Sequence, residues 1–267
     1  LTPCLTRHLL AGMKPGATLC YLDADLLFFE SPAPIWRALD SGSILVVQHR
    51  YPKWHDDSGL YGRFNVGVLG FRNDANGRAC LEWWRVRCLE SCALTSDATH
   101  YGDQKYLDEW PGRFEGVVDL KHPGVNLAPW NWAAQRITER DNAILVDGEP
   151  LVVFHFAQFR RISDRWFDSG QLEYGIMPRR IRSRIYGDYW DALIEAEAVI
   201  RRQRPGFSIP RRGWGATLGA WHLALLRLFW GQFWFRTNRS WWSARLGLGR
   251  WSGHAMGHYR RIKRQRS

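Results

Sequence analysis

The sequence predicts an α/β protein in which strands and helices alternate along the chain. Apolar runs of strand length recur between residues 18 and 156, at 18–29, 43–50, 64–74, 114–120 and 143–156. Segments with helical spacing or helix-terminating residues lie among them, at 5–13, 31–42, 75–92 and 102–112. This alternation is typical of layered α/β domains, and 45% apolar residues in a chain of 267 are enough to form a core.

Most of the expected helices carry start or stop signals. The segment 5–13 is stopped by the Lys-Pro-Gly that follows it, and 31–42 begins with a Ser and an early Pro and ends at a Gly. The segment 75–92 has helical spacing, whereas 102–112 is expected to end at Pro111. The strands and helices together predict one large α/β domain.

Charge divides the chain into two regions, an α/β domain over 1–197 and a basic, Trp-rich helical extension over 198–267. The extension holds 15 of the 37 basic residues and none of the 26 acidic ones, which leaves the domain with a net charge of −4. The overall charge of +11 therefore gives no support to nucleic-acid binding by the domain. No uncharged apolar run reaches the roughly 18 residues of a membrane-spanning helix.

Two carboxylates, Asp23 and Asp25, interrupt the apolar run at 18–29. In a strand, side chains repeat every two residues, so both acids are expected on one face. Neighbouring carboxylates repel each other unless a cation lies between them, and Mg²⁺ and Mn²⁺ take oxygen ligands. Because ligands of open α/β sheets bind beyond the carboxyl ends of strands, the position suits a metal–diphosphate site. General acid/base chemistry, as in glycoside hydrolases, and two solvated turn residues are the alternatives.

Five segments, in order within residues 1–165, match the motifs of a known family. They are YLDADLLFF, FNVGVLGFRND, GDQKYLDEWP, HPGVNLAPWN and VVFHFAQFR. They resemble the nucleotide-diphosphosugar transferases of the GT-A fold, most closely bacterial proteins related to glycosyltransferase family eight. The resemblance implies a mixed sheet flanked by helices. The strand and loop that hold the nucleotide in that fold precede the acidic pair, and this sequence has no counterpart of them.

The resemblance also implies a metal site. In this family the two acids hold a divalent metal, usually Mn²⁺, so Asp23 and Asp25 are the expected ligands of Mn²⁺ or Mg²⁺. Such a metal, acting as a Lewis acid, stabilises charge on the leaving diphosphate. A histidine near the end of the domain is often the third ligand, which nominates His155. Because His155 alternates with Val153 and Ala157, a core histidine is the alternative.

The family pattern assigns contacts with the donor sugar to four residues. Asn65 would bind sugar hydroxyls or the diphosphate, and Gly67 would let the backbone approach the sugar closely. Asp103 and Gln104 would hold sugar hydroxyls as an acid and an amide. The alternatives are an ordinary strand with a bulge, which suits Gly70, and helix N-capping by Asp103.

Basic residues in two segments of the domain are candidates for binding the diphosphate. Arg160 and Arg161 follow the nominated histidine, and a forked guanidinium fits phosphate oxygens. Arg50, which follows His49 after the second strand, could also face phosphate.

The segment HPGVNLAPWN is expected to shape the acceptor side of the site. Aromatic faces stack on sugars, and the polar residues could contact hydroxyls, although a packed loop is an equal alternative. The residues concerned are His122, Asn126 and Trp130.

The extension predicts binding to a membrane surface. It carries seven Trp, and its run at 214–235 is apolar but broken by His222, Arg227 and Gly231. In basic aromatic helices Trp lies at the headgroup level, and each Arg contributes roughly 1 kcal/mol near anionic lipid. We expect a cytoplasmic protein held peripherally at the inner face of the membrane. RNA or DNA binding is the less favoured alternative.

Together these motifs predict a metal-dependent glycosyltransferase that moves a sugar from a nucleotide-diphosphosugar, usually a UDP-sugar in this family, to a glycan or lipid-linked acceptor. The family implies retention of anomeric configuration and a role in envelope or capsular polysaccharide synthesis. A nucleotidyltransferase or phosphohydrolase could use the same paired acids. A nucleic-acid-binding protein that acts through the extension is the remaining alternative.

Overall fold

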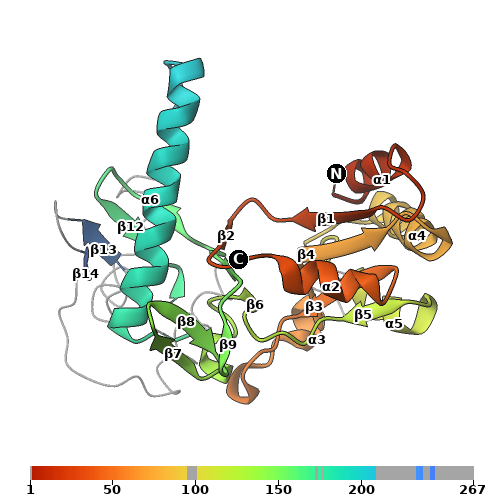
Figure 1. Ribbon diagram of the computed structural model, residues 1–267, viewed down its shortest axis with the longest axis horizontal. Helices are drawn as coiled ribbons and strands as arrows, with labels where there is room; N and C mark the ends of the chain where they lie inside the picture. Colours follow the sequence, from red (N-terminus) through yellow and green to blue (C-terminus); the bar gives the residue numbers. More distant parts are fainter. Residues whose placement is uncertain are drawn as a thin grey trace. The chain divides into compact units, whose positions relative to one another are not determined.

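The computed structural model describes residues 2–94, 101–171, 174, 175 and 177–208, and the backbone of 233–236 and 241–243. Contacts within the chain divide it into two compact units. The first comprises 1–127, 134–136 and 140–155, and the second comprises 128–133, 137–139 and 156–267. Both mix helices and strands (Figure 1), which confirms the prediction of an α/β protein.

The main sheet of the first unit has the strand order β1-β4-β3-β5. The strands are β1 (Thr18–Leu22), β3 (Ile44–Gln48), β4 (Phe64–Arg72) and β5 (Val117–Asp119). β4 is antiparallel to β1 and β3, whereas β5 is parallel to β3. The sheet is therefore mixed, and the carboxyl ends of β1 and β3 lie at the same edge as the start of β4.

Helices cover both faces of this sheet, because strand side chains alternate between the faces. Ile44 and Val46 of β3 pack in one core with α1 (Thr2–Ala11) and α4 (Ala75–Glu90), which lie side by side in Figure 1. Leu45 and Val47 pack in the other core with α2 (Ala33–Asp40). The central strand β3 thus ties the two cores together.

Strand β4 is irregular in its first half. Between Leu45 and Val47 of β3, the paired residue on β4 changes from Gly70 to Asn65. The side-chain Oδ1 of Asn65 accepts a hydrogen bond of 2.9 Å from the backbone N–H of Gly67, inside this irregular stretch. Bulges of this kind redirect side chains and are frequent next to active sites.

A second, three-stranded sheet of the first unit has the order β2-β10-β6. Its strands are β2 (Leu26–Phe28), β6 (Val125–Leu127) and β10 (Val153–His155). β10 is antiparallel to β2, with His155 opposite Leu26, and parallel to β6. This register places the end of β10 beside the residue that follows Asp25.

At 18–29 the sequence predicts a strand that runs into a loop, and the strand ends at Leu22, so the prediction that the two acids alternate within it is wrong. The chain leaves the main sheet after Leu22, turns at Ala24 and Asp25, and enters the second sheet at Leu26. A turn, and not the alternation of one strand, therefore sets the direction of the two acids.

The predicted helix at 102–112 is also different in the structure. It consists of a 3₁₀ segment, η2 (Lys105–Glu109), followed by α5 (Trp110–Arg113). Pro111 lies in the first turn of α5, where its missing N–H removes no helical hydrogen bond, so it does not end the helix. The remaining short elements are η1 (Lys53–His55), α3 (Ser58–Tyr61), η3 (Trp132–Ala134), β7 (Ile137–Arg140), β8 (Ala143–Val146) and β9 (Glu149–Pro150).

The second unit contains an antiparallel sheet and a long helix. The sheet has the order β11-β12-β13-β14, and the helix is α6 (Arg179–Gln203). The strands are β11 (Arg160–Arg161), β12 (Trp166–Asp168), β13 (Phe233–Arg236) and β14 (Trp241–Ser243). Sequence analysis missed α6, whose Ile181, Ile185 and Tyr189 recur at helical spacing on a buried face.

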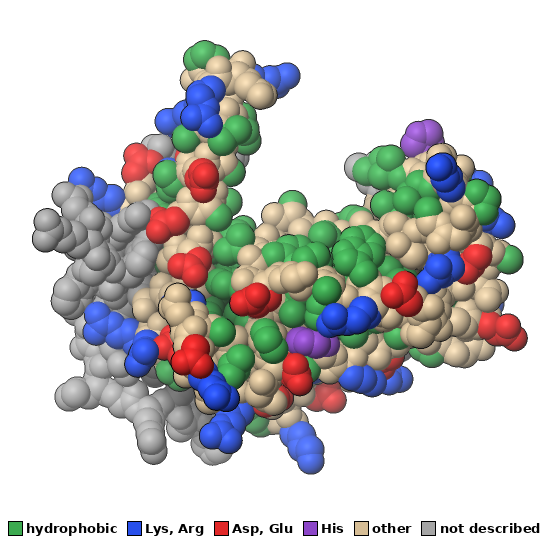
Figure 2. All heavy atoms as spheres, in the orientation of Figure 1, with side chains coloured by type: hydrophobic (Ala, Val, Ile, Leu, Met, Phe, Trp, Pro, Cys, Tyr) green, Lys and Arg blue, Asp and Glu red, His purple; other side chains and the backbone are tan. Residues whose placement is uncertain are grey.

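Most of the segment predicted to bind membranes, 214–235, lies outside the described residues, and its end at 233–235 belongs to a strand. Within the described part of the chain, no helix is both long enough and apolar enough to cross a membrane. On the face seen in Figure 2, acidic and basic side chains are interspersed over the described residues, which agrees with the small net charge of the body.

Candidate metal centre

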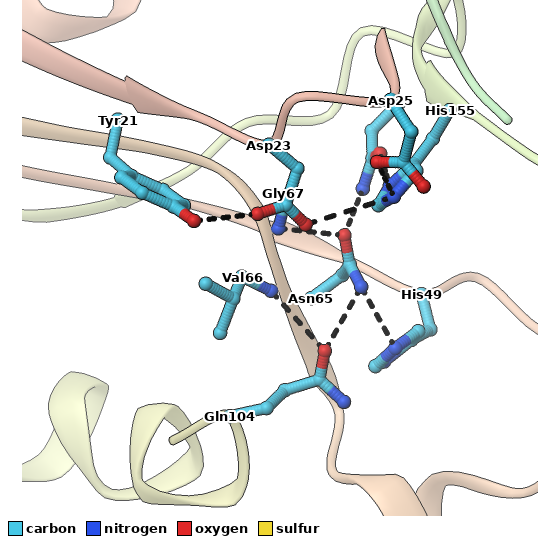
Figure 3. Close-up of polar contacts among 10 residues, drawn as sticks. Tyr21, Asp23, Asp25, His49, Asn65, Val66, Gly67, Gln104 and His155 are labelled. Carbon is cyan, nitrogen blue, oxygen red and sulfur yellow. Dashed lines mark hydrogen bonds and ion pairs between the residues drawn. The ribbon is translucent and has the colours of Figure 1, made fainter. Parts of the chain in front are cut away.

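The first unit brings Asp23, Asp25 and His155 together. Asp23 directly follows β1, Asp25 lies in the turn before β2, and His155 is the last residue of β10. The backbone N–H of Asp23 donates to the carbonyl of Gly67, so this residue is still held against β4. The three side chains meet in Figure 3.

The distances in this cluster suit a shared cation. His155 Nε2 lies 3.0 Å from an oxygen of Asp25 and 3.7 Å from an oxygen of Asp23. One ligand atom from each residue lies within 4.8 Å of the other two. The His155 side chain is only 6% exposed, whereas those of Asp23 and Asp25 are 30% and 43% exposed. The cluster is therefore closed on the imidazole side and open on the carboxylate side.

The two carboxylates have different electrostatic surroundings. Burial raises the pKa of Asp23, a tendency that the charges of Asp25 and Asp103 reinforce and the hydroxyl of Tyr21, which donates at 2.7 Å, opposes. Burial also acts to raise the pKa of Asp25, but the hydrogen bond and charge of His155 outweigh it and lower that pKa. The cluster holds more negative charge than the imidazole alone neutralises.

Behind the imidazole lies a chain of side-chain amides. His155 Nδ1 is 3.2 Å from Oδ1 of Asn126, and Nδ2 of Asn126 donates to Oδ1 of Asn65 at 3.0 Å. Asn65 Nδ2 donates to Oε1 of Gln104 at 3.0 Å, and Gln104 Nε2 donates to the carbonyl of Tyr61 at 2.8 Å. We call Asn126, Asn65 and Gln104 the amide relay.

The structure therefore places Asn65 and Gln104 beside the cluster but directs their amides to protein atoms. Asn65 accepts from Gly67 and Asn126 and donates toward Gln104 and His49, so its hydrogen-bonding capacity is used inside the protein. These contacts favour a positioning role over the predicted contact with a sugar. The role of Asn126 was missed, because the sequence signal pointed only to the acceptor side.

His49 supports the relay from the carboxyl end of β3. Its Nδ1 lies 2.9 Å from the carbonyl of Gly62, and its Nε2 lies 3.3 Å from Nδ2 of Asn65. Burial lowers the pKa of His49 to about 4, so the ring is neutral at pH 7. A neutral ring that donates from Nδ1 to Gly62 accepts at Nε2, which matches the amide group of Asn65.

Gly67 is required by the imidazole. A Cβ at this position would lie 2.6 Å from Nδ1 of His155 and 2.7 Å from Oδ1 of Asn65. The close approach predicted for a sugar is therefore made by the ring of His155.

Asp103 lies close enough to the cluster to raise the pKa of Asp23. Its backbone carbonyl accepts a hydrogen bond of 2.8 Å from Nε1 of Trp84, which ties it to α4. The first residue of η2 is preceded by Gln104, and no side chain caps that end, so N-capping by Asp103 is not observed. The contact predicted between the Asp103 carboxylate and hydroxyls of the donor sugar stays a prediction.

Arg160 and Arg161 belong to the second unit, where β11 holds them. Arg161 is 7% exposed, and its guanidinium contacts Glu197 at 2.5 Å and Asp164 at 2.9 Å and lies over the ring of Trp190. These contacts balance the charge of Arg161 inside the protein, and its phosphate contact stays a prediction. Arg160 is half-buried, and its proposed phosphate contact stays a prediction.

Three other candidates make structural contacts. The guanidinium of Arg50 donates to the backbone carbonyls of His122 at 3.0 Å and Val125 at 2.5 Å, so it supports the loop before β6. His122 Nδ1 accepts from the backbone N–H of Gly124 at 3.2 Å. Trp130, in the second unit, is 7% exposed and presents little aromatic surface for stacking.

Comparison with known proteins gives relatives without an assigned activity. No family model matches the sequence. The chain is 37% identical over 151 residues to the Bacillus subtilis (strain 168) protein YfnF, covering 54% of this chain and 50% of YfnF. It is 30% identical over 171 residues to YfnD of the same organism, covering 63% and 55%. The chain thus spans about half the length of these relatives, and both are described as uncharacterized proteins.

Proposed function

We propose that this protein is a metal-dependent glycosyltransferase of GT-A type that transfers a sugar from a nucleotide-diphosphosugar to a glycan or lipid-linked acceptor. The observation that carries the proposal is the convergence of Asp23, Asp25 and His155 at the carboxyl end of β1. Ligands of α/β sheets bind at such edges. The order of the sequence motifs adds to this support.

The donor set fits a divalent metal of intermediate hardness. Two carboxylates and one imidazole face a common point, and carboxylate with imidazole suits Mn²⁺ and tolerates Mg²⁺. Because the carboxylates are partly exposed, the diphosphate of a donor could complete the coordination from solvent. When bound, the ion supplies Lewis-acid stabilisation of the charge that develops on the leaving diphosphate.

In this proposal, different protein groups bind the metal, bind the sugar and position the side chains that do so. Asp23, Asp25 and His155 would hold the ion, and the carboxylate of Asp103 would accept hydrogen bonds from sugar hydroxyls. Asn65 and Gln104, whose amides bind protein atoms, would keep this arrangement rigid. Rigid supporting contacts reduce the reorganisation needed during reaction.

The direct test is incubation of the purified protein with a panel of UDP-sugars, with and without MnCl₂. Release of UDP that requires Mn²⁺ supports sugar transfer or hydrolysis of the donor, and transfer of label to a glycan or lipid acceptor separates these two. Release of UMP with sugar 1-phosphate would instead indicate phosphohydrolase action, and release of pyrophosphate in a parallel incubation with UTP and a sugar 1-phosphate would indicate nucleotidyl transfer; either result would overturn the proposal. Failure of the whole panel to yield UDP would also count against it.

The predicted location at the inner face of the membrane is a separate proposal. It depends on the extension at 198–267, most of which lies outside the described residues. Co-sedimentation of the full chain with anionic vesicles and with neutral vesicles tests it. Selective, salt-sensitive binding to anionic vesicles is the expected result. Binding to nucleic acid without vesicle binding would reject it.

A further inference from the structure

We propose that Asn126 is a positioning residue that, through the amide relay, keeps a proton on Nδ1 of His155 and leaves Nε2 as a lone-pair donor to the metal. This inference rests on the metal site of the proposed function. It concerns a residue that touches neither the ion nor the donor, and it makes a prediction about the protein without any ligand.

The orientation of the relay is fixed at Gln104 by the backbone. The N–H of Val66 points at Oε1 of Gln104 at 3.3 Å, so an oxygen must occupy that position. The carbonyl of Tyr61 lies 2.8 Å from Nε2, so a nitrogen must occupy the other. Backbone groups cannot exchange donor for acceptor, and therefore the amide of Gln104 cannot be reversed without breaking both bonds.

The orientation is fixed a second time at Asn65. The N–H of Gly67 points at Oδ1 of Asn65 at 2.9 Å, which requires an oxygen there. The opposite atom faces Oε1 of Gln104, which requires a nitrogen. His49 agrees, because its Nδ1–H is directed to the carbonyl of Gly62 and its Nε2 can only accept.

These two fixed amides determine the third. Because Oδ1 of Asn65 is an acceptor, the facing atom of Asn126 must be the donor Nδ2. Oδ1 of Asn126 then faces His155 Nδ1, and two acceptors cannot share that contact of 3.2 Å. This contact therefore requires the one proton of a neutral ring to be on Nδ1.

The amide relay opposes the effect that the nearest charge, that of Asp25, has on the tautomer of His155. Nε2 of His155 lies 3.0 Å from a carboxylate oxygen of Asp25, which by itself would draw the proton of a neutral ring to Nε2. That tautomer cannot bind a metal through Nε2. Partners that fix the other ring nitrogen typically affect metal affinity by 10–100-fold.

The backbone at Asn126 allows a clean substitution. Asn126 is fully buried and has φ of 59°, a conformation that Asn and Gly tolerate better than other residues. Asn126→Gly therefore removes the side chain without new strain, whereas Asn126→Asp keeps an acceptor for Nδ1–H. Asn142→Gly is the matched control, because Asn142 has φ of 66° but is exposed in the turn before β8.

The first experiment reads the tautomer by ¹⁵N NMR of histidine-labelled full-length protein at alkaline pH, with His155 assigned from His155→Gln. We expect Nδ1–H in the wild type, in Asn126→Asp and in Asn142→Gly, and Nε2–H in Asn126→Gly. Nε2–H in the wild type would overturn the inference by itself, even if Asn126→Gly does not fold. An unchanged tautomer in a folded Asn126→Gly protein would overturn it as well.

The second experiment titrates MnCl₂ alone into the same proteins by calorimetry. Asn126→Gly should weaken the affinity by roughly 10–100-fold, with the affinity of Asn142→Gly unchanged. Equal Mn²⁺ affinity in folded Asn126→Gly and wild type would reject the positioning role while the metal site stands. A wild type that binds no Mn²⁺ would reject the metal site of the proposed function, and with it the role of the relay in metal binding.

Discussion

Two charge clusters, one in each unit of the molecule, differ in how far their charges are balanced. In the second unit, Arg161 is enclosed by Glu197 and Asp164, and Arg201 contacts the same Glu197 at 2.6 Å. Each of these four charges has an opposite charge within 2.9 Å. In the first unit, Asp23 and Asp25 share one histidine as their ion-pair partner among the described residues. A balanced network stabilises a fold, whereas in the proposed function the unbalanced cluster holds a cation.

The largest expected effect comes from removing one charge of the unbalanced cluster. Asp25→Asn should lower Mn²⁺-dependent release of UDP by at least about a hundredfold, because metal-ion stabilisation of a leaving group contributes several kcal/mol. The thermal midpoint should hold or fall slightly, since the contact with His155 that lowers the pKa of Asp25 in the folded protein loses its charge. Turnover equal to that of the wild type, measured at saturating Mn²⁺, would remove this cluster from the catalytic assignment.

Removing a charge from the balanced network should instead damage the fold. Arg161→Met leaves Glu197 and Asp164 without their shared partner, and breaking a buried pair costs roughly 3–5 kcal/mol. Urea unfolding measures this loss, and Arg140→Met, in a fully exposed pair, should cost less than about 1 kcal/mol. Normal stability with weakened binding of the UDP-sugar would instead support the predicted phosphate-binding role of Arg161.

A third test uses the neutral histidine behind the cluster. The pKa of His49 is about 4 in the folded protein, whereas its ordinary value, which applies to the unfolded chain, is 6.5. The unfolded chain therefore binds this proton more tightly than the folded protein does. Stability from this group is complete above pH 6.5 and is lost as the pH falls toward 4. The difference corresponds to roughly 3 kcal/mol.

Urea unfolding at about pH 7 and about pH 4.5 measures this linkage. The loss of stability on acidification should be smaller in His49→Gln than in the wild type. Equal losses in the two proteins would mean that His49 is not held neutral. Its Nε2 could then no longer be treated as the acceptor for Nδ2 of Asn65.

The smallest expected effect comes from crowding the imidazole of His155 without substituting any of the three candidate ligands. Gly67→Ala places a Cβ against the ring of His155, so we expect weaker Mn²⁺ binding and a stability loss of about 1–3 kcal/mol. Gly70→Ala is the control on the same strand, since its Cβ would meet the side chain of Leu39 at 2.7 Å. If both variants weaken Mn²⁺ binding equally, the effect is general overpacking and not displacement of the ring.

Much of the main sheet could be predicted because its strands carry local signals. β3 is a continuous apolar run that both cores bury, and β4 is an apolar strand next to recognisable helix signals. The proximity of Asp23, Asp25 and His155 was anticipated from sequence motifs. The geometric reason was not, because alternation within one strand was expected where a turn into a second sheet occurs.

The remaining features depend on contacts between distant segments. Arg161 has the composition of a phosphate-binding residue, and only its partner 36 positions away shows that its charge is balanced. The relay joins β4, β6 and the segment before η2, and no periodicity connects these three. For α6, the signal was present at Ile181, Ile185 and Tyr189 but was masked by the surrounding Arg and Trp.

The register that pairs His155 with Leu26 joins parts of the chain that are 155 − 26 = 129 positions apart. An unfolded chain cannot present the three candidate ligands together, so an ion held by them would favour the native state alone. At a concentration of one hundred times its dissociation constant, such an ion adds about 2.7 kcal/mol to the free energy of unfolding. Manganese would then stabilise the tertiary structure as well as assist the reaction, and the thermal stability of the protein would depend on the Mn²⁺ concentration.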